Sequence, residues 1–191
     1  GWVEPNNPGG KSLYAFNPLA EEYSKMLVYR TNRAWRYYGQ NCGMMYLVSW
    51  PWDKENDMRT RQMQANGDIV MFLGGDPDPT DRTHAYRAGE TVRKNLVFIW
   101  DGVGENTLSA SWKLVDAKGR TVKDGKEKVS LRQGDIRKMP VEFTAPDVKG
   151  KSAYRFEVAF DAEKGMDNPA NATVKSDSFA FEVYPGNGEE G

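Results

Sequence analysis

The chain has 191 residues, of which 39% are hydrophobic and 28% are charged, so it suits one domain or a small domain with an appendage. Its 26 basic and 27 acidic residues leave a net charge of −1 without any block rich in Lys and Arg, which argues against nucleic-acid and anionic-membrane partners. The single cysteine, Cys42, excludes an intramolecular disulfide and a cysteine-based zinc site, and we predict no metal and no cofactor.

The N-terminal part of the chain predicts one long helix. Residues 1–16 are rich in Gly, Pro and Asn and predict irregular structure. Asn17 is a good N-cap, Pro18 suits the first helical position and Gly39 is a natural stop. Because apolar residues between them recur at spacings of three and four, we place a helix at residues 18–38.

Two apolar runs follow the helix. Residues 43–50 and 68–75 are typical of short buried strands, and the polar stretch between them predicts a loop with a helical turn at 56–64. Residues 76–84, DPDPTDRTH, contain two prolines in four residues and predict an irregular loop. The three carboxylates of this loop lack the central Gly and terminal Glu of an EF-hand.

From residue 81 onward the pattern changes to alternating polar and apolar residues with turn signals between short segments. This pattern predicts a mainly β fold, an Ig-like β-sandwich of about seven strands at residues 81–185, with Trp112 in its core. A helix-containing segment, residues 1–80, precedes the sandwich, and a Gly-rich acidic tail, residues 186–191, follows it. The predicted strands of the sandwich are residues 89–102, 108–119, 120–131, 139–146, 152–165 and 176–185.

The stretch GMMYLVSWPWD, residues 43–53, contains the candidate binding residues. Aromatic faces pack against the C–H faces of sugar rings, and carboxylates bind sugar hydroxyls. Tyr46, Trp50, Trp52 and Asp53 therefore predict a carbohydrate subsite. The alternative is that both Trp side chains close a hydrophobic core.

The acidic residues near this stretch do not form an evident catalytic pair. Glycoside hydrolysis requires two carboxyl groups that flank the scissile bond. Asp53, Glu55 and Asp57 all occur in one polar loop. The sequence gives no sign of a second acidic residue that would lie near Glu4 on a rigid element. The only histidine, His84, lies in a polar loop, which favours a solvated side chain over a Ser/His or Cys/His mechanism.

The order of these pieces resembles the C-terminal part of bacterial family 2-type, β-galactosidase-like glycoside hydrolases. The resemblance covers about residues 20–185 and rests on NRAWRYYG (32–39), GMMYLVSWPWD (43–53), DIVMFLGG (68–75) and RTHAYRAGETVRKNLVFIWD (82–101). In that family a (β/α)8 catalytic barrel ends with a helix rich in Arg and aromatic residues and with an eighth strand that carries a Trp. An Ig-like domain follows the barrel.

This resemblance implies that Trp50 matches the barrel-end Trp of the sugar subsite. Glu4 precedes the helix in the chain, as the nucleophile of that family does, but the surrounding sequence VEPNNPGG departs from the family's motif. The family's general acid and about six barrel strands have no counterpart in this sequence. We therefore predict no hydrolase activity for this chain alone, and the resemblance implies a periplasmic or extracellular bacterial location.

Three hypotheses follow. The first is a non-catalytic accessory module of a carbohydrate-active hydrolase, with a carbohydrate and the catalytic domain of the same parent protein as partners. The second is a free-standing carbohydrate-binding or cell-surface adhesion module with an Ig-like fold. The third is an enzyme in which Glu4 and Asp53 form the acid pair. Apolar surface left uncovered by absent barrel strands would favour a homodimer.

Overall fold

The computed structural model describes residues 18–39, 57–81, 83–168 and 173–186. The chain divides into two compact units, residues 1–66 and residues 67–191, and each is described by itself. None of the described helices is both long enough and apolar enough to cross a membrane.

The described part of the N-terminal unit consists of two helices. Helix α1 spans Pro18–Tyr37, which confirms the predicted helix, and α2 spans Asp57–Asn66, where a helical turn was predicted. Gly39 follows α1 with a φ of 75°, and its N–H donates to the carbonyl oxygen of Arg36 at 3.0 Å. This left-handed residue ends the helix at little steric cost because glycine has no Cβ. The Arg36 guanidinium also donates to the Ala65 carbonyl at 3.1 Å and so joins the two helices.

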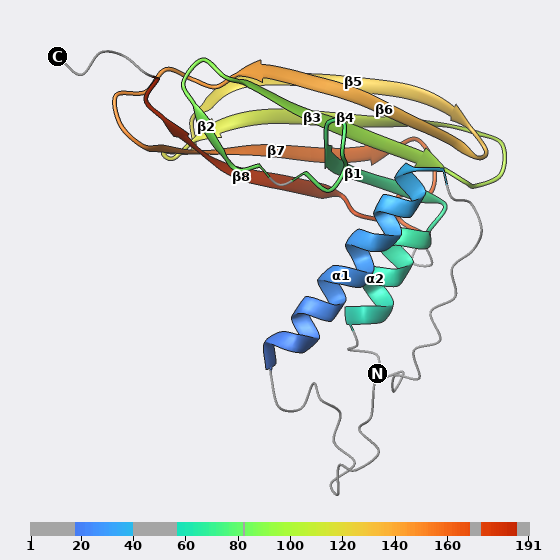
Figure 1. Cartoon of the computed structure of the whole chain (residues 1–191). Helices are drawn as coiled ribbons and strands as arrows, with labels where there is room; N and C mark the ends of the chain where they lie inside the picture. Colours follow the sequence, from blue (N-terminus) through green and yellow to red (C-terminus); the bar gives the residue numbers. More distant parts are fainter. Residues whose placement is uncertain (1–17, 40–56, 82, 169–172, 187–191) are drawn as a thin grey trace, which may run out of the picture. The chain divides into compact units, whose positions relative to one another are not determined.

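The second unit is a sandwich of two β-sheets (Figure 1). The three-stranded sheet has the order β1-β3-β6, and the five-stranded sheet has the order β2-β8-β7-β4-β5. The strands are β1 Ile69–Gly75, β2 Ala85–Arg87, β3 Thr91–Trp100, β4 Glu105–Asp116, β5 Thr121–Arg132, β6 Asp135–Thr144, β7 Ser152–Ala162 and β8 Ser176–Tyr184.

The strand order is that of an Ig-like sandwich. The chain contributes β1 to one sheet and then β2 to the other, where β2 pairs in parallel with β8. The chain also changes sheets from β2 to β3, from β3 to β4, from β5 to β6 and from β6 to β7, whereas β4 and β5, and likewise β7 and β8, are neighbours in one sheet. These crossings are typical of the Greek-key connections of Ig-like domains, and they confirm the predicted mainly β sandwich.

The position of β1 differs from the predicted domain organisation. Residues 68–75 were assigned to an N-terminal segment that ended at residue 80, whereas β1 pairs with β3 along its whole length, from Ile69 opposite Trp100 to Gly75 opposite Lys94. The boundary between the compact units accordingly falls after Asn66. An apolar run fits the last strand of a barrel and the first strand of a sandwich equally well, because periodicity does not reveal which strand will pair with it.

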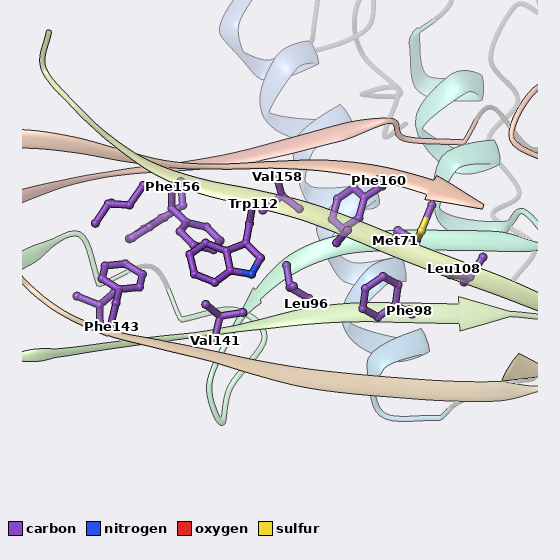
Figure 2. Packing of buried hydrophobic residues seen from close by; sticks show 14 of the residues in the cluster. Met71, Leu96, Phe98, Leu108, Trp112, Val141, Phe143, Phe156, Val158 and Phe160 are labelled. Carbon is purple, nitrogen blue, oxygen red and sulfur yellow. The ribbon is translucent and has the colours of Figure 1, made fainter. Parts of the chain in front are cut away.

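Aromatic side chains fill the space between the sheets. Phe156 is fully buried and stacks on Trp112, with ring centroids 5.4 Å apart, and on Phe143 at 5.6 Å. Phe98 meets Phe160 edge to face at 6.3 Å. Figure 2 shows these rings between the two layers together with aliphatic neighbours such as Leu108. The alternating pattern thus predicted the inward faces of β4, β7 and β8 correctly, and Trp112 is confirmed as a core residue.

Candidate functional site

The carbohydrate subsite predicted from the sequence lies outside the described residues. This applies to Tyr46, Trp50, Trp52 and Asp53, and also to the weak nucleophile candidate Glu4. Their roles therefore stay predictions. His84 is described and is exposed in the loop before β2.

The acidic loop of residues 76–81 uses its carboxylates locally. Asp78 accepts hydrogen bonds from the backbone N–H and the hydroxyl of Thr80, at 2.8 and 2.7 Å. Asp81 accepts the corresponding pair from Thr83, both at 2.8 Å. Within the described ranges there is no cluster of three or more His, Cys, Asp or Glu side chains that could hold a metal ion.

An open trough of about 1020 Å³ lies over the five-stranded sheet. Its lining residues alternate along β4, β5, β7 and β8, so the exposed ones share the outer face of the sheet. We call this surface the sheet trough. Its exposed lining residues on these strands are Ser111, Lys113, Thr121, Asp124, Lys126, Arg155, Ala159, Ser176 and Ser178.

Strand register arranges the sheet trough in two rows that run across the sheet. In the first row Lys126, Ser111, Ala159 and Ser176 are successive cross-strand neighbours. Directly opposed residues have Cβ atoms about 5 Å apart, so the row is continuous. Its other three members, Ser111, Ala159 and Ser176, have short side chains and form a low small-residue floor on the outer face of the sheet.

The second row is charged. Asp124, Lys113, Glu157 and Ser178 are successive neighbours in it, and Arg155 lies two residues from Glu157 on β7. The Lys113 ammonium lies 3.1 Å from one Glu157 oxygen, and Arg155 Nε lies 2.6 Å from the other. The hydrogen bond from Lys113 is the largest influence that lowers the pKa of Glu157, and the hydrogen bond from Arg155 lowers it further.

This arrangement favours a Glu157 that stays ionised. A glycosidase general acid requires a raised pKa, so that it still carries its proton near neutral pH. The pKa of Glu157 is shifted in the opposite direction. Asp124 is two strands away, about 10 Å by strand spacing, with Lys113 between the two acids. Glu157 therefore does not suit the general-acid role of a hydrolase.

Several polar groups in the sheet trough have no partner among the residues that the structure describes. The hydroxyls of Ser111, Ser176 and Ser178 make no hydrogen bond to any described residue, and Lys126 makes no ion pair with one. All four side chains are exposed. These groups can donate hydrogen bonds to a bound molecule without breaking contacts within the fold.

A buried lysine lies on the inner side of the sandwich. Lys94 on β3 is 2% exposed, and its ammonium lies 4.0 Å from the ring centroid of Phe179. It lines a small cavity of about 20 Å³ together with Asp81 and Asp177. The pKa of Asp81 is lowered, first by the hydrogen bonds from Thr83 and also by the charge of Lys94. Asp177 accepts the N–H of Leu73 at 3.0 Å and so connects β8 to β1.

Sequence reasoning missed both the sheet trough and Lys94, although the sequence contains a signal for each. Adjacent Arg93 and Lys94 in a strand must point to opposite faces, and the apolar Val92 and Leu96 show that Lys94 shares the inner face. For the trough, the outward positions 109 and 111 of β4 and 176, 178 and 180 of β8 are Ser or Ala, although long charged side chains are usual on the solvated face of a strand. Sequence alone does not bring these positions together, because β4 and β8 are not adjacent in the chain.

No protein-family model matches this chain, and no curated protein matches it either. Solved structures give partial matches. A β-glucuronidase of Bacteroides uniformis is 12% identical with a TM-score of 0.38, covering 60% of this chain and 13% of its own. A family 123 glycoside hydrolase from Clostridium perfringens is 10% identical with a TM-score of 0.41, covering 64% and 28%.

A third match has a different activity. The alkylpurine DNA glycosylase AlkC of Pseudomonas fluorescens, bound to DNA with an abasic site analogue, is 18% identical with a TM-score of 0.39, covering 65% of this chain and 33% of its own. This chain thus spans a third or less of each of the three proteins. Glycoside hydrolases are among its partial, low-identity structural matches, and matches this weak say nothing about its activity.

Proposed function

We propose that this chain is a non-catalytic accessory β-sandwich module of a carbohydrate-active glycoside hydrolase and that it supports the catalytic domain of the same parent protein. The main support is the state of Glu157 in the sheet trough. Lys113 and Arg155 hold this carboxylate in its charged form, which suits a fixed surface and not a proton donor.

The order of sequence pieces supports the same proposal from a separate direction. Under this proposal, residues 43–53 form the end of a catalytic barrel, and the side chains that contribute to a glycan site there are Tyr46, Trp50, Trp52 and Asp53. The parent enzyme then acts in the periplasm or outside a bacterial cell. The gene sequence that precedes Gly1 tests this part directly, since the proposal requires an in-frame barrel there.

An activity assay tests the non-catalytic role. The purified chain is incubated with a panel of aryl glycosides, beside Glu4→Gln, Asp53→Asn and Glu157→Gln variants. We expect the same rate as the protein-free blank for all four proteins. Turnover by the unmodified chain that disappears in Glu4→Gln and in Asp53→Asn would overturn the proposal in favour of an enzyme with that acid pair.

One observation favours a second function, a free-standing carbohydrate-binding module. The sheet trough is open, and it has hydroxyl and ammonium groups with no partner in the described part of the chain. Titration of oligosaccharides while Trp fluorescence is recorded separates the two functions. Saturable quenching would favour a binding module, and its loss in Trp50→Ala would assign the ligand to residues 43–53 and not to the sheet trough. An unchanged spectrum would favour a supporting role.

A further inference from the structure

We propose that two copies of this chain form a symmetric dimer through the outer edges of β5, which pair antiparallel with the two-fold axis at Gly125. The dimer concerns the edge of the five-stranded sheet and does not depend on the proposed function. It rests on an edge that β4 leaves open, on charges that match in one register, and on the lack of ion pairs for most of those charges within the described residues.

Strand β5 offers a long open edge. It is the last strand in the order β2-β8-β7-β4-β5, and within the described ranges β4 is the only strand that pairs with it. It has 12 residues, whereas β2 at the opposite edge of the sheet has 3. The backbone N–H and C=O groups on the side of β5 away from β4 therefore face outward. Such an edge is a template for a strand from another chain.

Symmetry restricts the registers in which two copies of β5 can pair. Directly opposed residues of an antiparallel pair lie on the same face of the sheet, so the two-fold axis must pass a residue that faces its own copy. Residues 123–128 fill the central part of β5. An axis at any charged residue of this part places a like charge against itself, and these residues are Lys123, Asp124, Lys126, Glu127 and Lys128. Only the axis at Gly125 avoids this.

The register centred on Gly125 also pairs opposite charges. Lys123 then faces Glu127 of the second copy, and Asp124 faces Lys126 of the second copy. The two-fold axis repeats both pairs, and residues 121–129 of the two copies overlap. Opposite charges that face each other across two strands stabilise the pairing, whereas like charges destabilise it. The sequence KDGKE at the middle of β5 is thus complementary to itself when it is read in the opposite direction.

Most of these charges have no ion-pair partner in the described part of the chain. This holds for Asp124, Lys126 and Glu127. Lys123 donates one hydrogen bond of 3.4 Å to the Glu142 carbonyl, and its ammonium retains two further donors. Charged side chains usually keep an edge strand from pairing with others. Here their alternating signs remove that obstacle in one register and keep it in the neighbouring ones.

Two further residues suit the same register. Gly125 has no side chain, so nothing on the axis separates the two backbones. Val122 is 50% exposed and would lie opposite Lys128 of the second copy. The alkyl part of a lysine can cover an apolar side chain while its ammonium stays in water. The pairing therefore also covers one of the exposed large hydrophobic side chains of the sandwich.

Sedimentation velocity of the full chain at about 5, 50 and 500 µM tests the proposal, because pairing along one strand buries less than a standard interface and should be of micromolar strength. We expect the sedimentation coefficient to rise with concentration at about 20 mM salt and to rise less at about 500 mM, where ion pairs are screened. Backbone amides of residues 121–129 should exchange hydrogen more slowly at the higher protein concentration.

Single charge reversals locate the contact. Lys126→Asp places acids against acids across the axis, and Asp124→Lys places bases against bases. Each should raise the dissociation constant of the dimer at least about tenfold, because two attractive pairs become repulsive. Lys149→Asp makes the same change of charge as Lys126→Asp on an exposed loop residue outside β5, and it should leave the dissociation constant unchanged. Circular dichroism checks that each variant is folded.

Two rescue experiments distinguish the pairing from a general loss of stability. An equimolar mixture of Lys126→Asp and Asp124→Lys should form a heterodimer, since each acid of the first variant faces a base of the second. The double variant Asp124→Lys/Lys126→Asp exchanges the two charges, and it should dimerise as the unmodified chain does. Neither result is expected if the single variants merely misfold.

The outcomes bear on this inference separately from the proposed function. A chain that stays monomeric at about 500 µM in low salt would overturn it. So would equal losses in Lys126→Asp and Lys149→Asp, a mixture of the two reversals that stays monomeric, or a dimer that neither reversal weakens. Turnover of aryl glycosides, by contrast, bears only on the non-catalytic role, whether or not the chain dimerises.

Discussion

The indole ring of Trp112 lies over the backbone of Gly125, its cross-strand partner on β5. A Cβ at position 125 would overlap the ring, so the largest side chain of β4 is accommodated by the absence of one on β5. The next pair along the same two strands, Ser111 and Lys126, belongs to the first row of the sheet trough.

Gly125→Ala should therefore destabilise the sandwich, although alanine normally suits a strand interior better than glycine. Overpacking of a filled core costs about 1–3 kcal/mol. Urea unfolding followed by Trp fluorescence measures the change. The control is Gly150→Ala, since a Cβ there meets nothing within 4 Å, and it should change stability by less than about 0.5 kcal/mol. Equal effects of the two substitutions would show that Trp112 does not depend on Gly125.

Phe156→Ala should be strongly destabilising. Phe156 has no exposed surface and stacks on both Trp112 and Phe143, so its removal leaves a cavity in the centre of the aromatic core. Truncation of a buried Phe to Ala costs about 3–5 kcal/mol. Val103→Ala is a suitable control because Val103 is 90% exposed. Comparable urea midpoints for the two variants would contradict the described core.

Lys94→Met should raise the pKa of Asp81. The charge of Lys94 is one of the influences that hold this pKa below its ordinary value of 3.8, and methionine has a similar length without the charge. The pKa can be followed through the side-chain carboxyl resonance in an NMR titration. The hydrogen bonds from Thr83 remain, so part of the shift should persist, and Thr83→Val should remove a larger part of it. An unchanged Asp81 titration in Lys94→Met would mean that the two charges do not interact.

The pKa of Asp81 also predicts a pH dependence. Because its pKa is lower in the folded chain than in the unfolded one, Asp81 contributes stability above about pH 4 that is lost as the pH falls through the folded pKa. Thermal midpoints measured from about pH 6 to about pH 2 should fall less steeply in Asp81→Asn than in the unmodified chain. Parallel curves for the two proteins would exclude this contribution.

Tyr86 predicts a loss of stability at alkaline pH. Burial is the main reason that the pKa of Tyr86 is raised from 10.0 to about 12, and the charges of Asp81 and Glu90 add to it. Since the folded pKa exceeds the unfolded one, this contribution is fully present below about pH 10 and disappears as the pH rises toward 12. Tyr86→Phe should lose less stability over that range. Ultraviolet absorbance of tyrosinate checks the titration itself.

Much of the fold was predictable because local rules agree with the tertiary structure. Pro18 and Gly39 delimit α1 as their backbone preferences require. The period of two in β4, β7 and β8 identified the core residues, since one face of each strand is buried. Strand β2 was missed because three residues are too few for a period to be visible.

The arrangement of the surface was not predictable in the same way. Lys126, Ser111, Ala159 and Ser176 come from four strands, and only the register of three strand pairs makes them neighbours. Similarly, Asp124 and Glu157, the two acidic residues in the second row of the sheet trough, resemble ordinary surface charges in the sequence. Their roles depend on Lys113, which lies between them.

The sequence by itself thus determined the extent of α1, most strands of the sandwich and the buried faces of β4, β7 and β8, because these properties follow from residue spacing within one segment. The tertiary structure alone decided that β1 belongs to the sandwich, that Lys94 has acidic and aromatic neighbours and that free hydroxyls gather in the sheet trough. Strand pairing joins residues far apart in the chain through backbone hydrogen bonds, and those bonds are the same for every side chain. A single sequence therefore contains little information about which strands will meet.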